Sequence, residues 1–271
     1  MRPHVIRLGA GLGMALTLAL AGGVAAQAPA PSCPTTGNVI RGGAGADTLN
    51  GTAAVDNIFA AAGDDTVNGL QADDCVLGGD GLDVITGASG NDTVFGEAGP
   101  DDLSGDRGND RLAGGDGFDF LSGGLGKDEL FGEGGPDDLS GGRGDDELEG
   151  GDDIDFLEGG LGRDVMRGGD GDDDLAGGFD LDRISGGEGD DRLSGGFGND
   201  SMTGDDGNDD LSGGDGRNTY LAGDGNDTVD AANGVRETRV NCGRGRDTVR
   251  ADANDRVRGC ERVFRLSRAD R

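Results

Sequence analysis

The chain has 271 residues, of which 60 are glycine, and only 33% of it is hydrophobic, with no tryptophan. This composition lacks the material for the thick apolar core of a conventional globular domain of that length. The formal net charge of −31 disfavours binding to nucleic acid or to anionic membranes, and it indicates cations or basic surfaces as partners.

The first 26 residues have the three parts of a secretory signal peptide. Arg2 and Arg7 give a positively charged start, the rest of the segment is apolar and small, and a small-residue cleavage site follows near Ala26. The alternative is a retained membrane anchor, which the glycine-rich apolar region and the lack of a second apolar span argue against. We therefore predict a signal helix over 1–26, a linker or N-terminal cap over 27–41, and a secreted, extracellular protein without membrane contact after cleavage.

A strict repeat occupies residues 42–230. In frame from Gly42, the chain divides into 21 consecutive nine-residue units that end at Asp230, without insertion or deletion. Position 1 is Gly in 19 units, position 4 is Gly in 17, position 6 is Asp in 20, and position 8 is apolar in all 21. Low hydrophobicity with high charge is typical of disorder, but a disordered glycine-rich tract does not explain an apolar residue at such regular spacing.

The pattern within a unit predicts a tight turn followed by a very short strand. One apolar residue in nine cannot form an amphipathic helix, which needs three or four per two turns. Glycine at fixed places marks backbone with positive φ or close approach. Side chains alternate along a strand, so position 8 points inward while positions 7 and 9 point outward. Such short strands gain a shared core only by stacking in parallel, which makes the chain an all-β solenoid.

The unit G-G-x-G-x-D-x-(apolar)-x resembles the RTX, or hemolysin-type, calcium-binding nonapeptide repeat. Examples are GGDGFDFLS from 114, GGRGDDELE from 141 and GGEGDDRLS from 186. The resemblance covers 42–230 and implies a parallel β-roll with two repeats per turn. Alternate units then stack on opposite edges of the roll, one strand spacing, about 4.8 Å, apart.

The resemblance also implies multiple Ca²⁺ ions between successive turns, held by the position-6 aspartates and by carbonyls of the glycine turns. Ca²⁺ prefers six to eight oxygen ligands, whereas Mg²⁺ dehydrates reluctantly, and zinc or copper would lack histidine and free thiols. The expected ligands are Asp47, Asp65, Asp83, Asp92, Asp101, Asp110, Asp119, Asp128, Asp137, Asp146, Asp155, Asp164, Asp173, Asp182, Asp191, Asp200, Asp209 and Asp227.

Some units depart from the turn pattern, so we expect fewer than the roughly 19 inter-turn sites that this geometry allows. Residues 51–56 and 69–74 lack the glycine turn, and for this reason their aspartates are omitted from the expected ligands. Asp153 and Asp180 replace glycine at position 4, and Asn218 replaces aspartate at position 6.

Residues 231–271 carry eleven arginines against six acidic residues, and we predict a basic, β-like C-terminal cap there. Cys242 and Cys260 are 18 residues apart, one full turn of the roll that the resemblance implies, so they are expected to form a disulfide. Cys33 and Cys75 are then the remaining pair. The arginine excess is either a solvated cap that offsets the acidic roll or a docking site for an acidic polymer.

The sequence predicts no enzyme. Removal of the signal peptide removes the single histidine, His4, so no Ser-His-Asp triad or HExxH site can form. Two non-catalytic roles stay open: a calcium-ion-binding protein whose repeats fold around Ca²⁺, or a surface or matrix adhesin in which calcium only rigidifies the rod. For the adhesin, a cell-surface or polysaccharide ligand could contact outward aromatic residues, which are Phe118, Phe120, Phe156, Phe179 and Phe197.

Overall fold

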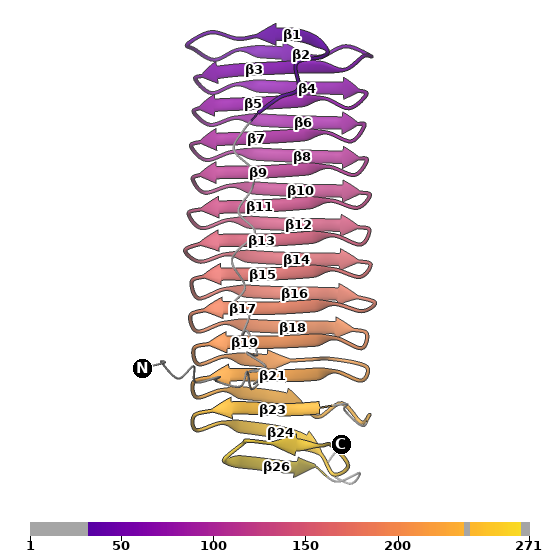
Figure 1. The fold of residues 1–271 in the computed structure, drawn as a ribbon, viewed down its shortest axis with the longest axis vertical. Coiled ribbons are helices and arrows are strands. Elements are labelled where there is room, and N and C mark those ends of the chain that lie inside the picture. The colour runs from indigo at the N-terminus through magenta and orange to yellow at the C-terminus, as the bar shows by residue number, and fades with distance from the viewer. Residues whose placement is uncertain (1–31, 236–238, 267–271) are drawn as a thin grey trace, which may run out of the picture.

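The computed structural model describes residues 32–235 and 239–266. These form parallel strands that lie across one long axis and stack along it (Figure 1). Two 13-stranded sheets face each other, and consecutive strands alternate between them. The first sheet comprises β1 (Asn38–Arg41), β3 (Asp56–Ala62), β5 (Cys75–Asp80), β7 (Thr93–Ala98), β9 (Arg111–Asp116), β11 (Glu129–Gly134), β13 (Glu147–Asp152), β15 (Val165–Asp170), β17 (Arg183–Glu188), β19 (Ser201–Asp206), β21 (Thr219–Asp224), β23 (Arg239–Arg244) and β25 (Val257–Arg258). The second sheet comprises β2 (Thr48–Asn50), β4 (Thr66–Gln71), β6 (Val84–Ser89), β8 (Asp102–Arg107), β10 (Phe120–Leu125), β12 (Asp138–Arg143), β14 (Phe156–Leu161), β16 (Asp174–Phe179), β18 (Arg192–Phe197), β20 (Asp210–Ser212), β22 (Thr228–Ala231), β24 (Thr248–Asp252) and β26 (Arg262–Leu266).

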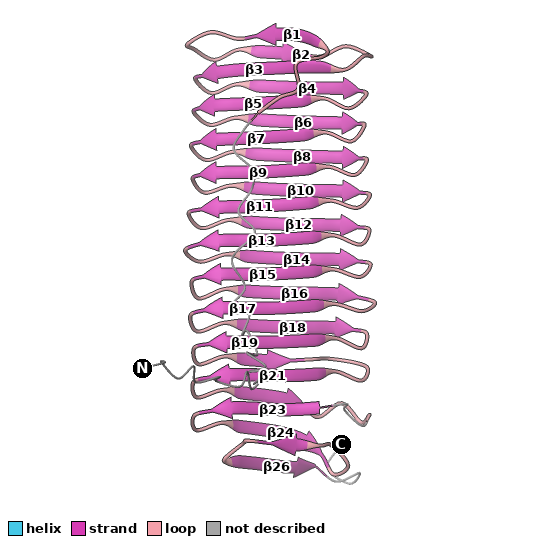
Figure 2. Cartoon of the chain, viewed as in Figure 1, coloured by secondary structure: helices cyan, strands magenta, loops and turns pink. Residues whose placement is uncertain are grey.

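The predicted all-β parallel solenoid with two repeats per turn is confirmed. Within the regular repeats each strand residue pairs with the one 18 positions later, as Leu121 does with Leu139. Among the described residues the secondary structure consists of strands and loops (Figure 2), and no helix there is long and apolar enough to cross a membrane. The predicted signal helix over 1–26 lies outside the described residues.

The core is a narrow apolar layer between the two sheets. Position 8 supplies it from every unit between Ile58 and Val229, with each side chain at most 2% exposed. Because both sheets contribute one such residue per turn, the core is continuous along the whole stack. Burial of one Leu, Ile or Val side chain contributes roughly 1.5–3 kcal/mol, so stability depends on repetition rather than on a thick centre.

The glycine turns are tight because successive turns approach each other at backbone distance. Gly144 has φ +149°, and a Cβ there would overlap the carbonyl oxygen of Gly126, one turn earlier. Where glycine is replaced at position 4, Asp153 and Asp180 still adopt φ of 74° and 79°. Aspartate tolerates left-handed backbone better than most residues, so these units keep the turn that the sequence put in question.

The solenoid continues past the last regular repeat. Two extra residues change the register, so that Val229 pairs with Val249, 20 positions later. The predicted cap has β-structure, and four of its valines, Val240, Val249, Val257 and Val263, lie in strands.

Both predicted disulfides are present. Cys242 and Cys260 join neighbouring turns, with a Cα–Cα distance of 5.2 Å. Cys33 and Cys75 are joined at a Cα–Cα distance of 5.5 Å, which ties the segment before β1 to β5 in the first sheet. The described cysteines therefore include no free thiol.

Candidate metal site

The two-repeat turn places the position-6 aspartates in two columns, one along each edge of the stack. The first column lies in the loops that follow the first-sheet strands, at left in Figure 1, and the second column lies at the opposite edge. In each column the backbone N–H of one aspartate donates to Oδ1 of the aspartate one turn later, as Asp137 does to Asp155 at 2.8 Å. The same bond recurs along both columns at 2.7–3.1 Å.

The second carboxylate oxygen, Oδ2, has no hydrogen-bond donor in most of these loops. It is buried and unpartnered in nineteen column aspartates of the described chain, eighteen at position 6 and Asp247 beyond the last repeat: Asp65, Asp74, Asp83, Asp92, Asp101, Asp110, Asp119, Asp128, Asp137, Asp146, Asp155, Asp164, Asp173, Asp182, Asp191, Asp200, Asp209, Asp227 and Asp247. All of them are at most 2% exposed. An unsatisfied buried polar atom costs about 1–3 kcal/mol, and more if it is charged. A cation or a proton bound at each carboxylate would offset this repeated cost.

From Asp74 onward, burial raises the pKa of these carboxyl groups, and the N–H bond from the previous turn offsets only part of that rise. The pKa of Asp155 rises to about 8, with the carboxylates of Asp173 and Asp137 adding to the effect of burial. The pKa rises to about 7 for Asp92, Asp101, Asp137, Asp182 and Asp191. It rises to about 6 for Asp74, Asp110, Asp119, Asp128, Asp146, Asp164, Asp173, Asp209 and Asp227. The fold thus holds carboxylates where a bare negative charge is unfavourable.

Glycine at position 1 leaves space for the unpartnered oxygen. A Cβ at Gly186 would overlap Oδ2 of Asp191, and it would lie 2.8 Å from the carbonyl oxygen of Gly204 in the next turn. At position 4, a Cβ on Gly144 would lie 3.0 Å from Oδ1 of Asp146 as well as overlapping a carbonyl oxygen. The interior of each loop is therefore lined by carboxylate and carbonyl oxygens from two successive turns.

This donor set fits Ca²⁺. The ion prefers oxygen ligands at about 2.3–2.6 Å and accepts carbonyls together with carboxylates. Among residues 32–235 and 239–266, no three His, Cys, Asp or Glu side chains converge on one point. Backbone carbonyls would therefore supply much of the coordination, and the position-6 aspartates would supply the charge.

The first turn differs from the others. Oδ2 of Asp47, an expected ligand, already accepts the N–H of Gly43 at 2.6 Å. Oδ2 of Asp56 accepts the N–H and hydroxyl of Thr52, at 2.6 and 3.0 Å. Although burial acts to raise the pKa of Asp56, hydrogen bonds from Asn38 and Thr52 lower it overall. The protein itself satisfies both carboxylates, so they are weaker candidates for an ion.

Besides Asp56, two aspartates that were not among the expected ligands join the columns. Asp74 lies in the second column with Oδ2 unpartnered, despite the irregular turn before it. Asp247 continues the first column, where its Oδ1 accepts the N–H of Asp227 at 3.1 Å. The signal for Asp247 was Gly243-x-Gly245-x-Asp247-x-Val249, which the two-residue insertion removes from the nine-residue frame. Glu261 ends this column by accepting the N–H of Asp247.

The second column ends at Asn218. Its Oδ1 accepts the N–H of Asp200 at 2.8 Å, so the ladder bond survives the substitution. The amide has a single oxygen, however, and cannot offer the second one that the aspartates leave free.

Comparison with known protein families decides what these columns belong to. The RTX calcium-binding nonapeptide repeat (4 copies) matches overlapping segments from 35–67 to 203–235, which together span most of the chain. The chain belongs to this family of RTX calcium-binding repeat proteins. The search of curated proteins found no match. The matched segments are all RTX repeats, which are typically non-catalytic, and they identify no catalytic domain.

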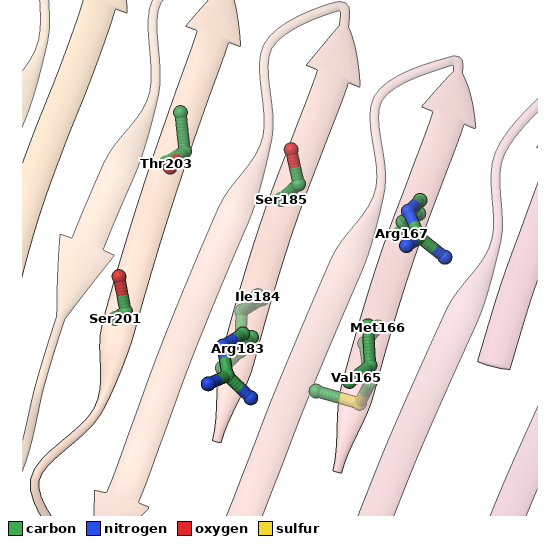
Figure 3. A pocket seen from close by; sticks show the side chains of 8 residues that line it. All are labelled: Val165, Met166, Arg167, Arg183, Ile184, Ser185, Ser201 and Thr203. Atoms are coloured by element: carbon green, nitrogen blue, oxygen red, sulfur yellow. The ribbon is translucent and has the colours of Figure 1, made fainter. Parts of the chain in front are cut away.

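The RTX columns are separate from the hollows on the sheet surfaces. One hollow on the outer face of the first sheet crosses β15, β17 and β19, and Figure 3 shows the side chains that line it. Arg167 in this hollow forms an ion pair with Glu147 at 2.8 Å. Ser185 donates a hydrogen bond to Asp205 at 2.5 Å. These polar groups pair with one another on the sheet surface, whereas the Oδ2 atoms without a donor lie in the loops.

Proposed function

We propose that the protein is a secreted, non-catalytic calcium-binding protein whose RTX repeats fold as Ca²⁺ binds. The observation that carries the proposal is the repeated buried Oδ2 without a donor, found at nineteen described aspartates. Two carboxylates about 5 Å apart repel by roughly 3 kcal/mol at an effective dielectric of 20. A divalent cation between successive turns would attract both carboxylates. The free energy of ion binding would therefore contribute directly to the free energy of folding.

Secretion is supported by two features. The N-terminal pattern over 1–26 is that of a signal peptide, and both disulfides in the structure, Cys33–Cys75 and Cys242–Cys260, require an oxidising compartment to persist. Extracellular fluids also contain enough calcium for modules that bind at about 10⁻⁴–10⁻³ M.

A pair of adjacent aspartates tests the proposal. Asp173 is 2% exposed with Oδ2 unpartnered, whereas Asp174 is the next residue and lies at an outward position of β16. Asp173→Asn removes a ligand oxygen and a buried charge, so calorimetry should show fewer bound Ca²⁺ ions and a higher midpoint for calcium-induced folding. Asp174→Asn changes the net charge equally and should leave both quantities unchanged. Equal effects of the two variants would show that calcium responds to total charge rather than to the columns.

The adhesin is the second candidate, because several large apolar side chains are exposed. Among them, Phe118 and Phe120 are 44% and 47% exposed, and their rings contact each other with centroids 4.8 Å apart. In this alternative, calcium would serve only to hold such a surface rigid. Binding to cells or matrix that persists after calcium removal would favour neither role. Binding that requires both calcium and the exposed aromatic residues would favour the adhesin.

A further inference from the structure

A row of exposed apolar pairs runs along the edge where the first-sheet strands end, at left in Figure 1. We call this row the apolar ridge. Its side chains come from positions 5 and 7 of alternate turns and are 39–52% exposed: Leu82 with Val84, Phe118 with Phe120, and Ile154 with Phe156. Exposed apolar side chains that gather at one edge of an otherwise acidic rod form a candidate binding surface.

The turns between these pairs carry proline and an outward carboxylate. Pro100 and Asp102 occupy positions 5 and 7 of one turn, and Pro136 and Asp138 occupy them two turns later. In the second sheet Phe120 pairs with Asp102 on one side and with Asp138 on the other. Both carboxylates are exposed. Apolar pairs and carboxylates therefore alternate along the axis, with a period of 36 residues or two turns.

The length of this period selects the kind of ligand. Two strand spacings amount to about 9.6 Å. Three residues of polyproline II helix rise about 9.3 Å and complete one turn, so every third side chain returns to the same face. Seven residues of α-helix rise about 10.5 Å, and a β-strand repeats its face every roughly 6.7 Å. The polyproline II repeat matches the ridge best, because over its four strand spacings the mismatch is about 0.6 Å, against about 1.8 Å for the α-helix.

The charge of the ridge selects the chemistry of the ligand. The carboxylates of Asp102 and Asp138 lie between apolar pairs, and the chain has a net charge of −31. Cationic side chains that recur at the same spacing would meet these carboxylates, while proline rings would pack on Phe120 and Phe156. Aromatic surfaces bind polyproline II segments in this way in other recognition modules. A second copy of this chain would present carboxylates to carboxylates, which disfavours self-association.

We propose that the apolar ridge binds a proline-rich, basic segment of another protein in the polyproline II conformation. Lys or Arg at every third residue contacts Asp102 and Asp138, and the intervening residues pack against the apolar pairs. The proposal goes beyond calcium binding, although it requires the folded loops that we propose calcium stabilises. The ridge and the first aspartate column share these loops, since Asp119 lies between Phe118 and Phe120.

The direct test measures binding of a labelled peptide of about three Pro-Pro-Arg triplets, roughly 28 Å long, which covers the roughly 19 Å between the first and last pairs of the ridge. Fluorescence anisotropy would be recorded with the calcium-loaded protein. A peptide of equal composition, with prolines and arginines in separate blocks, is the control for charge alone. We expect the triplet peptide to bind at least about tenfold more tightly, the difference that one good anchor contact supplies.

Matched variants locate the site. The double variant Phe120→Thr, Phe156→Thr should weaken binding by about tenfold or more, as should Asp102→Asn with Asp138→Asn. The control Phe179→Thr, Phe197→Thr removes another exposed aromatic pair, whose rings stack 5.0 Å apart at a different edge, and it should leave binding unchanged. Circular dichroism in Ca²⁺ verifies that each variant is folded, which separates failure of the ridge from failure of calcium-driven folding.

Three results would overturn the proposal. They are equal binding of the triplet and block peptides, unchanged binding after loss of the ridge aromatics, or binding of a neutral cello-oligosaccharide in place of the peptide. The last result would identify the ridge as a carbohydrate platform.

Discussion

The two oxygens of a position-6 carboxylate have different roles in this protein. In Asp155, Oδ1 accepts an N–H from the previous turn at 2.8 Å and so fixes the side chain, while Oδ2 stays buried without a donor. Asparagine can perform the first role, as Asn218 does with Asp200. Only aspartate can perform both, because it has a second acceptor oxygen and a charge. The repeated choice of aspartate therefore indicates that the second oxygen is needed.

Position-1 glycine can be tested at Gly186, where a Cβ would overlap Oδ2 of Asp191. Gly186→Ala should destabilise the calcium-loaded protein by about 1–3 kcal/mol, because the added methyl group overpacks the loop. Chemical denaturation in excess Ca²⁺ measures this change. Gly45→Ala is the control, since a Cβ there has no neighbour within 4 Å. Equal stability of the two variants would contradict the assignment of the loop interior.

The raised pKa values predict how pH acts on the calcium-free protein. Burial raises the folded-state pKa of Asp155 to about 8 and of Asp92 to about 7, above the unfolded value of about 3.9. Their protonation then stabilises the fold fully below about pH 4, and this contribution is lost as the pH rises through about 7 to 8. In calcium-depleted buffer, far-UV circular dichroism should thus show more β-structure at pH 5 than at pH 8. A spectrum that is independent of pH, or one with more structure at pH 8, would argue against these buried carboxylates.

At the scale of the turn, the regular frame made the fold predictable. Two nine-residue units per turn placed Leu121 beside Leu139 and put Cys242 and Cys260 on neighbouring turns, and the structure has both features. The same frame failed beyond Asp230, because two inserted residues moved Asp247 out of the expected positions. A shift in register leaves composition and local motif intact, so sequence spacing alone does not place such a residue.

Sequence alone also did not show which aspartates keep a free Oδ2 where a unit departs from the repeat pattern or lies at the end of the stack. Asp74 follows an irregular turn but keeps its place in the column, since Ala72 adopts φ 78° without glycine. Conversely, Asp47 fits the motif, yet the chain itself satisfies its Oδ2. Whether a carboxylate is free depends on neighbours one turn away and on the end of the stack, which a single repeat does not encode.

The stability of the C-terminal turns should depend on the disulfide between Cys242 and Cys260. The bridge between Cys242 and Cys260 closes a separation of 18 residues, for which the chain-entropy account gives up to about 3 kcal/mol. In the double variant Cys242→Ala, Cys260→Ala, amide hydrogen exchange in β23–β26 should accelerate, while β11–β13 in the middle of the stack should exchange as before. Uniform acceleration along the whole solenoid would indicate global rather than terminal stabilisation by this bridge.

At the scale of the whole molecule, repulsion between acidic side chains opposes the folding of the stack. Residues 42–230 contain 48 acidic and nine basic residues, and the stack brings acidic side chains of successive turns within one strand spacing of each other. A solenoid is stabilised by contacts between neighbouring turns, so each ion bound between two turns would strengthen the contact that those turns share. Calcium-driven folding should accordingly be cooperative along the rod.

The most direct test of this account is far-UV circular dichroism of the chain without residues 1–26, at neutral pH during a Ca²⁺ titration, with Mg²⁺ in parallel. We expect a cooperative gain of β-structure with Ca²⁺ and little change with Mg²⁺, because Mg²⁺ retains its water and suits these flexible oxygen sites poorly. A spectrum that does not respond to Ca²⁺, or that responds equally to both ions, would contradict the claim that the aspartate columns bind calcium as the protein folds.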